Sequence, residues 1–266
     1  MYLEHYGLKT FPFNITANPD FFYGSRSHEE ALATLSYGIT QRKGIMSLTG
    51  EVGTGKTTVC KALLDRLEGK TKTSLILNPF FSQHQLLEAV LQDFGVISTG
   101  TKSKLELIHR LNHFLIETNS AGAEAVLVID EAQNLSAPQL EQIRLLSNLE
   151  TAQDKLLQVV LSGQPELEQK LAKHNLRQLK QRISIKCSLS PLKKEEIEEY
   201  VRHRLTKAGK TDLEISPASF ETIFIFSEGI PRLINALCDR AMLCGFAHGT
   251  KNLTHELFAE CVKELQ

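Results

Sequence analysis

Residues 50–57 read Gly50-Glu51-Val52-Gly53-Thr54-Gly55-Lys56-Thr57 and are followed by Thr58. They match the pattern G-x-x-x-x-G-K-[ST], in which a glycine-rich loop wraps the phosphates of a nucleotide. Residues 45–49 have the composition of a short buried strand, and residues 57–67 have the spacing of an amphipathic helix. A strand before the loop and a helix after it form the context that this pattern requires. The sequence therefore predicts a nucleotide-binding loop that opens a helix.

Each residue type in this loop has a physical role. Glycine permits backbone angles and a close approach that a Cβ would forbid. Successive N–H groups at a helix N-terminus can then face an anion. We expect residues 50–58 to contact ATP, Lys56 to reach its β- and γ-phosphates, and Thr57 to place its hydroxyl on Mg²⁺. The alternative is a glycine-rich turn that contains Lys-Thr by chance, and the flanking strand and helix argue against it.

The composition is that of an ordinary globular protein. Of 266 residues, 42% are hydrophobic and 23% are charged, and the net charge of −1 gives no general basic field for nucleic acid or an anionic membrane. The five cysteines form no C-x-x-C pair, which indicates reduced thiols and no zinc site. No apolar run has the length of a membrane span, and residues 1–5 lack the features of an export signal. We therefore expect a cytoplasmic protein.

Strand-like and helix-like segments alternate from residue 45 onward. The strand candidates are 45–49, 73–77, 125–129, 156–161 and 183–187. Near-continuous apolar strands separated by helices predict a parallel sheet covered on both faces. After Pro191 the segments 193–208, 217–227, 231–247 and 254–264 all have helical spacing, and no strand is expected between them. The fold class is thus α/β with a C-terminal all-helical domain.

Three regions follow from this pattern. We expect an aromatic arm and a helix over 1–44 packed on the α/β core, a nucleotide-binding α/β domain over 45–190, and a helical domain over 191–266. Proline and asparagine interrupt any continuous helix near the N-terminus, while the aromatic side chains there need burial.

Two carboxylates follow the apolar segment 125–129. Asp130 and Glu131 should therefore lie at the C-terminal edge of the sheet, where a doubly wound fold binds ligands. We expect Asp130 to hold the hydrated Mg²⁺, and Glu131 to polarise the water that attacks the γ-phosphate. The alternative is a surface turn with two solvated acids. The buried strand before them, in a chain that also carries the loop, favours catalysis.

Polar and basic residues elsewhere are further candidates. After the next strand, Ser162 or Gln164 could hydrogen-bond the attacking water or the γ-phosphate, and turn chemistry explains either residue equally well. Arg182, or else Arg177, could stabilise the charge of phosphoryl transfer from a neighbouring subunit, unless both form a solvated basic face. Arg232 lies in the first turn of a helix, where the positive end of the helix dipole disfavours a cation. A contact with the γ-phosphate would explain why an arginine stands there.

Together these segments resemble AAA+ ATPases of the general secretion pathway A (GspA/ExeA) type, with relatives in MSHA pilus biogenesis (MshM) and exosortase systems. The resemblance spans nearly the whole chain. It rests on Tyr6-Gly7-Leu8, Pro12-Phe13, Phe21-Phe22-Tyr23, Gly50 to Thr58, Asp130-Glu131-Ala132-Gln133-Asn134-Leu135, Gly163-Gln164-Pro165-Glu166-Leu167, Gln181-Arg182-Ile183 and Gly229-Ile230-Pro231-Arg232-Leu233-Ile234-Asn235.

The resemblance implies a P-loop sheet of order 5-1-4-3-2 and a helical lid. Lys56 and Thr57 correspond to Walker A, and Asp130 and Glu131 to Walker B. Ser162 or Gln164 would be sensor 1, Arg182 an arginine finger that acts in trans, and Arg232 the sensor 2 arginine. The region 27–30 would line the adenine pocket, with the Pro12-Phe13 arm nearby.

The resemblance also implies a biological setting. It favours a homo-oligomeric ATPase that supports an envelope machine, for secretion or pilus assembly, at the inner face of the bacterial inner membrane through its partners. Secretion-type members usually continue into a membrane span and a periplasmic region, so both a short stand-alone protein and an N-terminal fragment remain open. The alternative is a DNA-associated AAA+ regulator of the transposition or origin-loader kind, against which the neutral charge argues. A nucleotide-regulated scaffold with little hydrolysis is a third reading, against which Asp130 and Glu131 argue.

Overall fold

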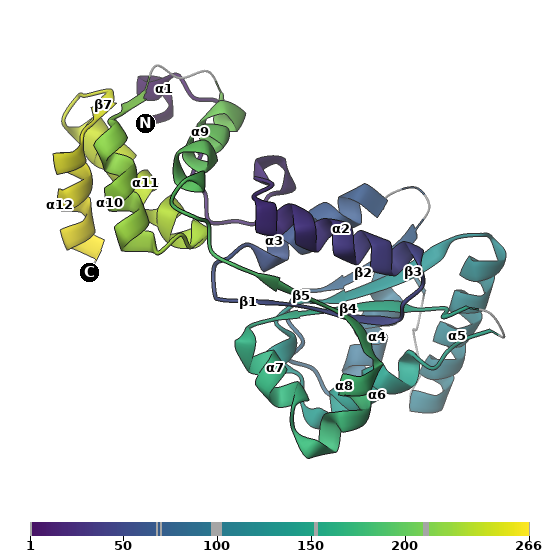
Figure 1. Ribbon diagram of the computed structural model, residues 1–266. Helices are drawn as coiled ribbons and strands as arrows, with labels where there is room; N and C mark the ends of the chain where they lie inside the picture. Colours follow the sequence, from purple (N-terminus) through teal and green to yellow (C-terminus); the bar gives the residue numbers. More distant parts are fainter. Residues whose placement is uncertain are drawn as a thin grey trace. The chain divides into compact units, whose positions relative to one another are not determined.

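The computed structural model describes residues 2–67, 69, 71–96, 103–151, 154–209 and 213–265. The chain divides into two compact units, and most of their helices and strands are labelled in Figure 1. The sheet unit comprises residues 29–50 and 59–189, and the helical unit comprises residues 1–28, 51–58 and 190–266.

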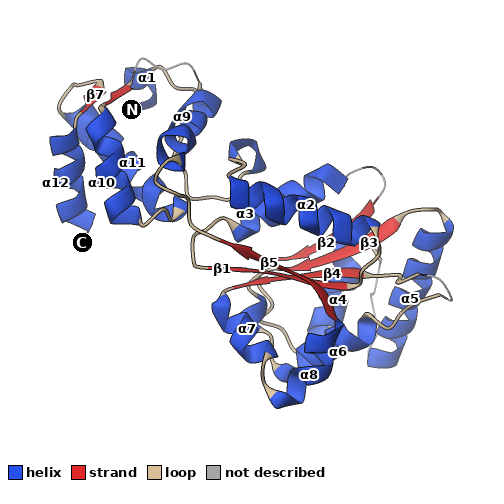
Figure 2. Cartoon of the chain, viewed as in Figure 1, coloured by secondary structure: helices blue, strands red, loops and turns tan. Residues whose placement is uncertain are grey.

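A parallel five-stranded sheet forms the centre of the sheet unit (Figure 2). Its strands are β1 (Ile45–Gly50), β2 (Thr71–Ile76), β3 (Glu124–Ile129), β4 (Gln158–Gly163) and β5 (Ile183–Leu189). Their order is β2-β3-β4-β1-β5, which confirms the predicted order 5-1-4-3-2. β1 and β4 are buried at every residue, as is β3 after its first, whereas the edge strands β2 and β5 are only partly buried. The inner strands therefore read as continuous apolar runs in the sequence.

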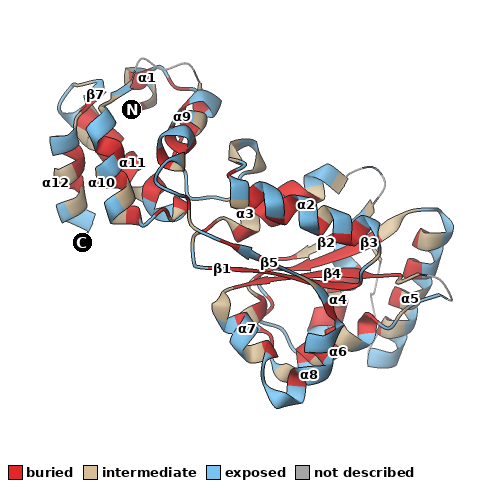
Figure 3. Ribbon diagram, viewed as in Figure 1, coloured by how far each residue is buried: buried red, intermediate tan, exposed pale blue. Residues whose placement is uncertain are grey.

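Helices cover both faces of this sheet (Figure 1). α2 (Arg26–Thr40) and α3 (Lys56–Leu67) lie on one face. The other face carries α4 (Gln83–Asp93), α5 (Lys104–Ser120), α6 (Ala137–Leu146), α7 (Pro165–Leu171) and α8 (Arg177–Arg182). Two 3₁₀ helices, η2 (Ala132–Asn134) and η3 (His174–Leu176), complete this second layer. Burial is concentrated in the strands and in the helix faces that meet them (Figure 3).

The helical unit contains α9 (Glu196–Ala208), α10 (Pro217–Ser227), α11 (Pro231–Ala247) and α12 (His255–Leu265). Pro217 and Pro231 occupy the first turn of their helices, as expected. The expectation of no strand between these helices is wrong, because β6 (Glu214–Ile215) pairs in parallel with β7 (Asn252–Leu253). Extended backbone between helices needs hydrogen-bond partners, and these two short segments supply them to each other.

The N-terminal arm belongs to the helical unit. It contains α1 (Tyr2–Tyr6) and the 3₁₀ helix η1 (Pro19–Phe21). The side chains of Tyr6 and Phe13 are buried in the same apolar cluster as α9 to α12. Arg204 of α9 is 8% exposed and donates from Nε to the Pro12 carbonyl at 2.6 Å. The division therefore differs from the expected one over 1–44: the arm packs with the helical unit, and only the helix from Glu29 onward belongs to the sheet unit.

Candidate functional site

The predicted phosphate loop runs from the end of β1 into the first turn of α3. Gly53 and Gly55 have φ angles of +83° and +99°, in the left-handed region that favours glycine. Lys56 is buried, and its Nζ donates to the carbonyl of Glu51 at 2.9 Å. The Thr54 hydroxyl donates to the same carbonyl at 2.8 Å. The loop is thus closed on Glu51, with a cation held inside it.

Arg232 lies beside this loop. Its backbone N–H donates to the carbonyl of Gly53 at 3.3 Å. A Cβ built on Gly53 would lie 2.7 Å from the Cβ of Arg232, so only glycine lets α11 approach the loop this closely. The structure therefore brings together two predicted site elements, the loop and the first turn of α11, that lie far apart in the sequence.

A cavity in the helical unit is lined by aromatic side chains and by the same loop. Its lining includes Phe21, Phe22, Tyr23, His28, Gly55 and Pro231. Flat aromatic faces suit the stacking of a planar heterocycle. Of the region 27–30 that was expected to line an adenine pocket, His28 lines this cavity.

Asp130 and Ser162 lie together at the carboxyl ends of β3 and β4. Asp130 is 2% exposed, and its Oδ1 accepts the Ser162 hydroxyl at 2.7 Å. The N–H of Glu131 donates to the same oxygen at 3.0 Å. Because β3 and β4 are neighbouring parallel strands, their carboxyl ends lie next to each other at the same end of the sheet, as predicted.

Glu131 is held by two glutamine amides. Its backbone is in the left-handed region, with φ of +51°. Oε2 of its carboxylate accepts from Nε2 of Gln133 at 2.5 Å and from Nε2 of Gln164 at 3.2 Å. The N–H of Gln164 in turn donates to Oε1 of Gln133 at 3.1 Å. The carboxylate is thus fixed by a closed set of amide contacts.

Gln133 is a residue that the sequence analysis missed as a part of the site. Its signals in the sequence were its place two residues after Glu131 and its position in the segment Asp130 to Leu135 that carries the family resemblance. A Cβ on Gly163 would lie 2.8 Å from Oε1 of Gln133, so the glycine makes room for this amide. The two sensor 1 candidates also have different partners, since Ser162 binds Asp130 and Gln164 binds Glu131.

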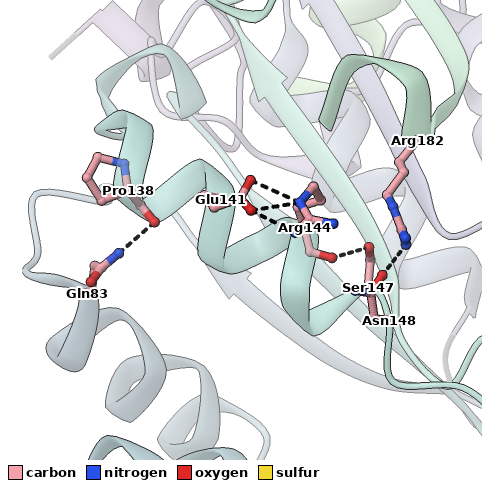
Figure 4. A network of polar contacts seen from close by, with 7 residues as sticks. All are labelled: Gln83, Pro138, Glu141, Arg144, Ser147, Asn148 and Arg182. Carbon is pink, nitrogen blue, oxygen red and sulfur yellow. Dashed lines mark hydrogen bonds and ion pairs between the residues drawn. The ribbon is translucent and has the colours of Figure 1, made fainter. Parts of the chain in front are cut away.

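Arg177 and Arg182 are exposed on α8. Arg182 donates from Nη1 to the side chain of Asn148 (Figure 4). Nearby, Nε of Arg144 donates to Glu141 at 2.9 Å, and this hydrogen bond lowers the pKa of the Glu141 carboxyl.

Arg182 directly precedes β5, whereas the carboxylates directly follow β3. These positions lie at opposite ends of the parallel strands, about 20 Å apart along the strand direction for strands of six residues. β3 and β5 are also three positions apart in the sheet, which adds about 14 Å across it. Arg182 therefore does not reach the carboxylates of its own sheet unit.

The donor set fits a nucleotide with Mg²⁺. The residues expected to hold the ion, Thr57 and Asp130, offer hydroxyl and carboxylate oxygens, the ligand type that Mg²⁺ takes. The cation of Lys56 and the left-handed glycines of the loop suit phosphate oxygens.

Among the described residues, no helix is both long enough and apolar enough to cross a bilayer.

Known proteins are similar to this chain over nearly its whole length. The chain is 44% identical over 255 residues to general secretion pathway protein A of Aeromonas hydrophila, which confirms the resemblance to the GspA type. That match covers 96% of this chain, and the chain spans 47% of the relative's length.

Solved structures with low sequence identity share the fold. The Aeropyrum pernix ORC2 protein matches with a TM-score of 0.74 at 16% identity, over 94% of this chain and 72% of that one. Cdc6p of Pyrobaculum aerophilum gives a TM-score of 0.73 at 16% identity, over 92% and 70%. The Thermotoga maritima RuvB branch migration motor gives 0.63 at 18% identity, over 95% and 73%. A family model described as an AAA domain matches residues 39–171, which is half of the chain. The chain therefore belongs to the family of AAA domains.

Proposed function

We propose that this protein binds ATP through residues 50–58 and hydrolyses it to ADP and phosphate with Mg²⁺. One observation carries the proposal: the loop is a left-handed glycine turn that opens α3 and holds the cation of Lys56 inside it. Such a turn presents successive N–H groups and a positive charge, which match the phosphates of a nucleotide. The base would lie against the aromatic side chains beside Gly55, because the cavity that they line has a volume of only about 40 Å³.

The catalytic roles follow from the chemistry of phosphoryl transfer. Mg²⁺, held by Thr57 and Asp130, would neutralise charge on the phosphates. Glu131 accepts the proton of the attacking water, and the amides of Gln133 and Gln164 orient its carboxylate. Ser162 fixes Asp130, while Lys56 and Arg232 stabilise the charge on the phosphate oxygens.

We further propose that the active form is a homo-oligomer in which Arg182 acts on the nucleotide of a neighbouring copy. The position of Arg182 at the opposite ends of the strands supports this, because the residue lies more than about 20 Å from the carboxylates of its own sheet. Its exposure leaves it accessible to a second copy. An arginine supplied in trans can accelerate phosphoryl transfer by several orders of magnitude.

The similarity to general secretion pathway protein A supports a role in an envelope machine for secretion or pilus assembly. We propose that ATP-dependent oligomerisation drives this assembly from the cytoplasmic side of the membrane. The likeness to origin-recognition proteins is one of fold at 16% identity, and it adds nothing in favour of DNA binding to a chain of net charge −1.

Three variants test these proposals. Lys56→Ala should abolish ATP binding, and Glu131→Gln should bind MgATP but not turn it over. The hydrolysis rate per wild-type subunit should rise with protein concentration, and Arg182→Ala should remove that rise. No MgATP turnover by the wild type would refute the ATPase, whereas normal turnover by Glu131→Gln would refute only the role of Glu131 as the base. A rate independent of both concentration and Arg182 would refute only the trans arginine.

A further inference from the structure

His28 connects the N-terminal arm to the phosphate loop. It lies in the first turns of α2 and is 5% exposed. Its Nε2 is 2.9 Å from the carbonyl oxygen of Thr54, within the loop. Its Nδ1 is 2.5 Å from the hydroxyl of Ser25, in the arm. The ring of Phe22 meets it edge to face, with centroids 6.1 Å apart.

The partners of the imidazole determine where its proton lies. A carbonyl oxygen can only accept a hydrogen bond, so Nε2 must carry the proton and donate it to Thr54. The Ser25 hydroxyl can then donate to Nδ1 and hold the ring in this tautomer. His28 is therefore a fixed donor aimed at one peptide group of the loop.

That peptide joins Thr54 to Gly55. A trans peptide is planar, and its C=O and N–H point in opposite directions. The described residues contain no cis peptide, so a carbonyl held on His28 sends the N–H of Gly55 to the opposite side. Gly55 permits this arrangement with φ of +99°, and a Cβ there would lie 2.9 Å from Nε2 of His28. The Thr54 hydroxyl is occupied by Glu51, so it does not compete for the imidazole.

We propose that His28 is a positioning residue of the phosphate loop, which aims the N–H of Gly55 at the phosphates by holding the Thr54 carbonyl. The inference rests on the proposed nucleotide binding and adds a residue that lies outside the glycine-rich pattern. If the Thr54–Gly55 peptide flipped, the carbonyl oxygen of Thr54 would face the phosphates in place of the N–H of Gly55. The loss of His28 should therefore weaken phosphate binding more than base binding.

The test compares three ligands by titration calorimetry: MgATP, MgADP and adenosine, which lacks phosphate. His28→Ala should weaken MgATP and MgADP binding about tenfold, as expected for one lost hydrogen bond that also frees a peptide. Adenosine should lose clearly less affinity than either nucleotide, because it lacks the phosphates and meets His28 only as one of the residues that line the aromatic cavity. His28→Gln retains a side-chain N–H donor and should recover most of the affinity. His113→Ala, at an exposed histidine of α5, is the matched control and should bind all three ligands as the wild type does.

The outcomes separate this inference from the proposed function. If His28→Ala binds MgATP as tightly as the wild type, or loses affinity for adenosine to the same degree, His28 does not position the loop. Loss without recovery in His28→Gln, at an unchanged melting temperature, would also overturn the donor role. A wild type that binds neither MgATP nor MgADP would refute the nucleotide site itself.

Discussion

The amide of Gln133 offers a sharp test of how Glu131 is held. Gln133→Met keeps the length of the side chain but removes the donor Nε2, which lies 2.5 Å from Oε2 of Glu131. A hydrogen bond to a charged group contributes about 1.5 to 3 kcal/mol. Each 1.36 kcal/mol lost from the transition state is tenfold in rate. The longer contact from Gln164, at 3.2 Å, should retain part of the orientation, so we expect the lower end: kcat about tenfold lower.

Steady-state ATPase kinetics, with kcat and KM determined separately, would measure this effect. Gln133 acts on the base and not on the loop, so KM for MgATP should stay within about twofold. Gln169→Met, at an exposed glutamine of α7, is the matched control and should leave both constants unchanged. A Gln133→Met protein with wild-type kcat would refute the positioning of Glu131. An increase in KM alone, with kcat unchanged, would place the role of Gln133 in substrate binding.

Two further predictions concern stability and thiol chemistry. Gly229 has φ of +78°, and a Cβ there would lie 2.0 Å from the backbone oxygen of Leu192, so Gly229→Ala should lose more than about 2 kcal/mol in urea unfolding. Gly249→Ala, with positive φ but open space, should lose only about 1 kcal/mol, and equal losses would show that the contact is harmless. Burial raises the pKa of the Cys187 thiol from 9.0 to about 11. At pH 9 about one molecule in a hundred then carries the reactive thiolate, so alkylation of Cys187, followed by mass spectrometry, should accelerate about ninefold between pH 9 and 10; a rise of less than about twofold, which an unshifted thiol would give, would contradict the shift.

The sheet was predictable because its strands carry local signals. β1, β3 and β4 are buried throughout most of their length, and burial on both faces leaves an uninterrupted apolar run in the sequence. The bounds of the strands were less predictable, because β2 begins at Thr71, two residues before its expected start, and β4 begins at Gln158, two residues after its expected start. The order of the strands is not a local property. It came from the resemblance to a family, and the register of β1 against β4 and β5 confirms it.

The site residues also differ in whether the sequence carries a local signal for them. The loop and Asp130-Glu131 could be predicted from the sequence, because their chemistry requires particular residues at particular spacings. Gln133 and His28 were not assigned their contacts, because a hydrogen-bonding side chain has no spacing rule. The contact of Gln133 follows from the fold of η2, which directs its amide toward Glu131. The space for this amide depends on Gly163, thirty residues further along the chain. The contact of His28 with Thr54 depends likewise on how the N-terminal arm packs. The sequence led us to expect the arm on the α/β core, whereas it belongs to the helical unit. Tertiary packing therefore selects which polar residues hold the reactive groups, while the sequence pattern selects the reactive groups themselves.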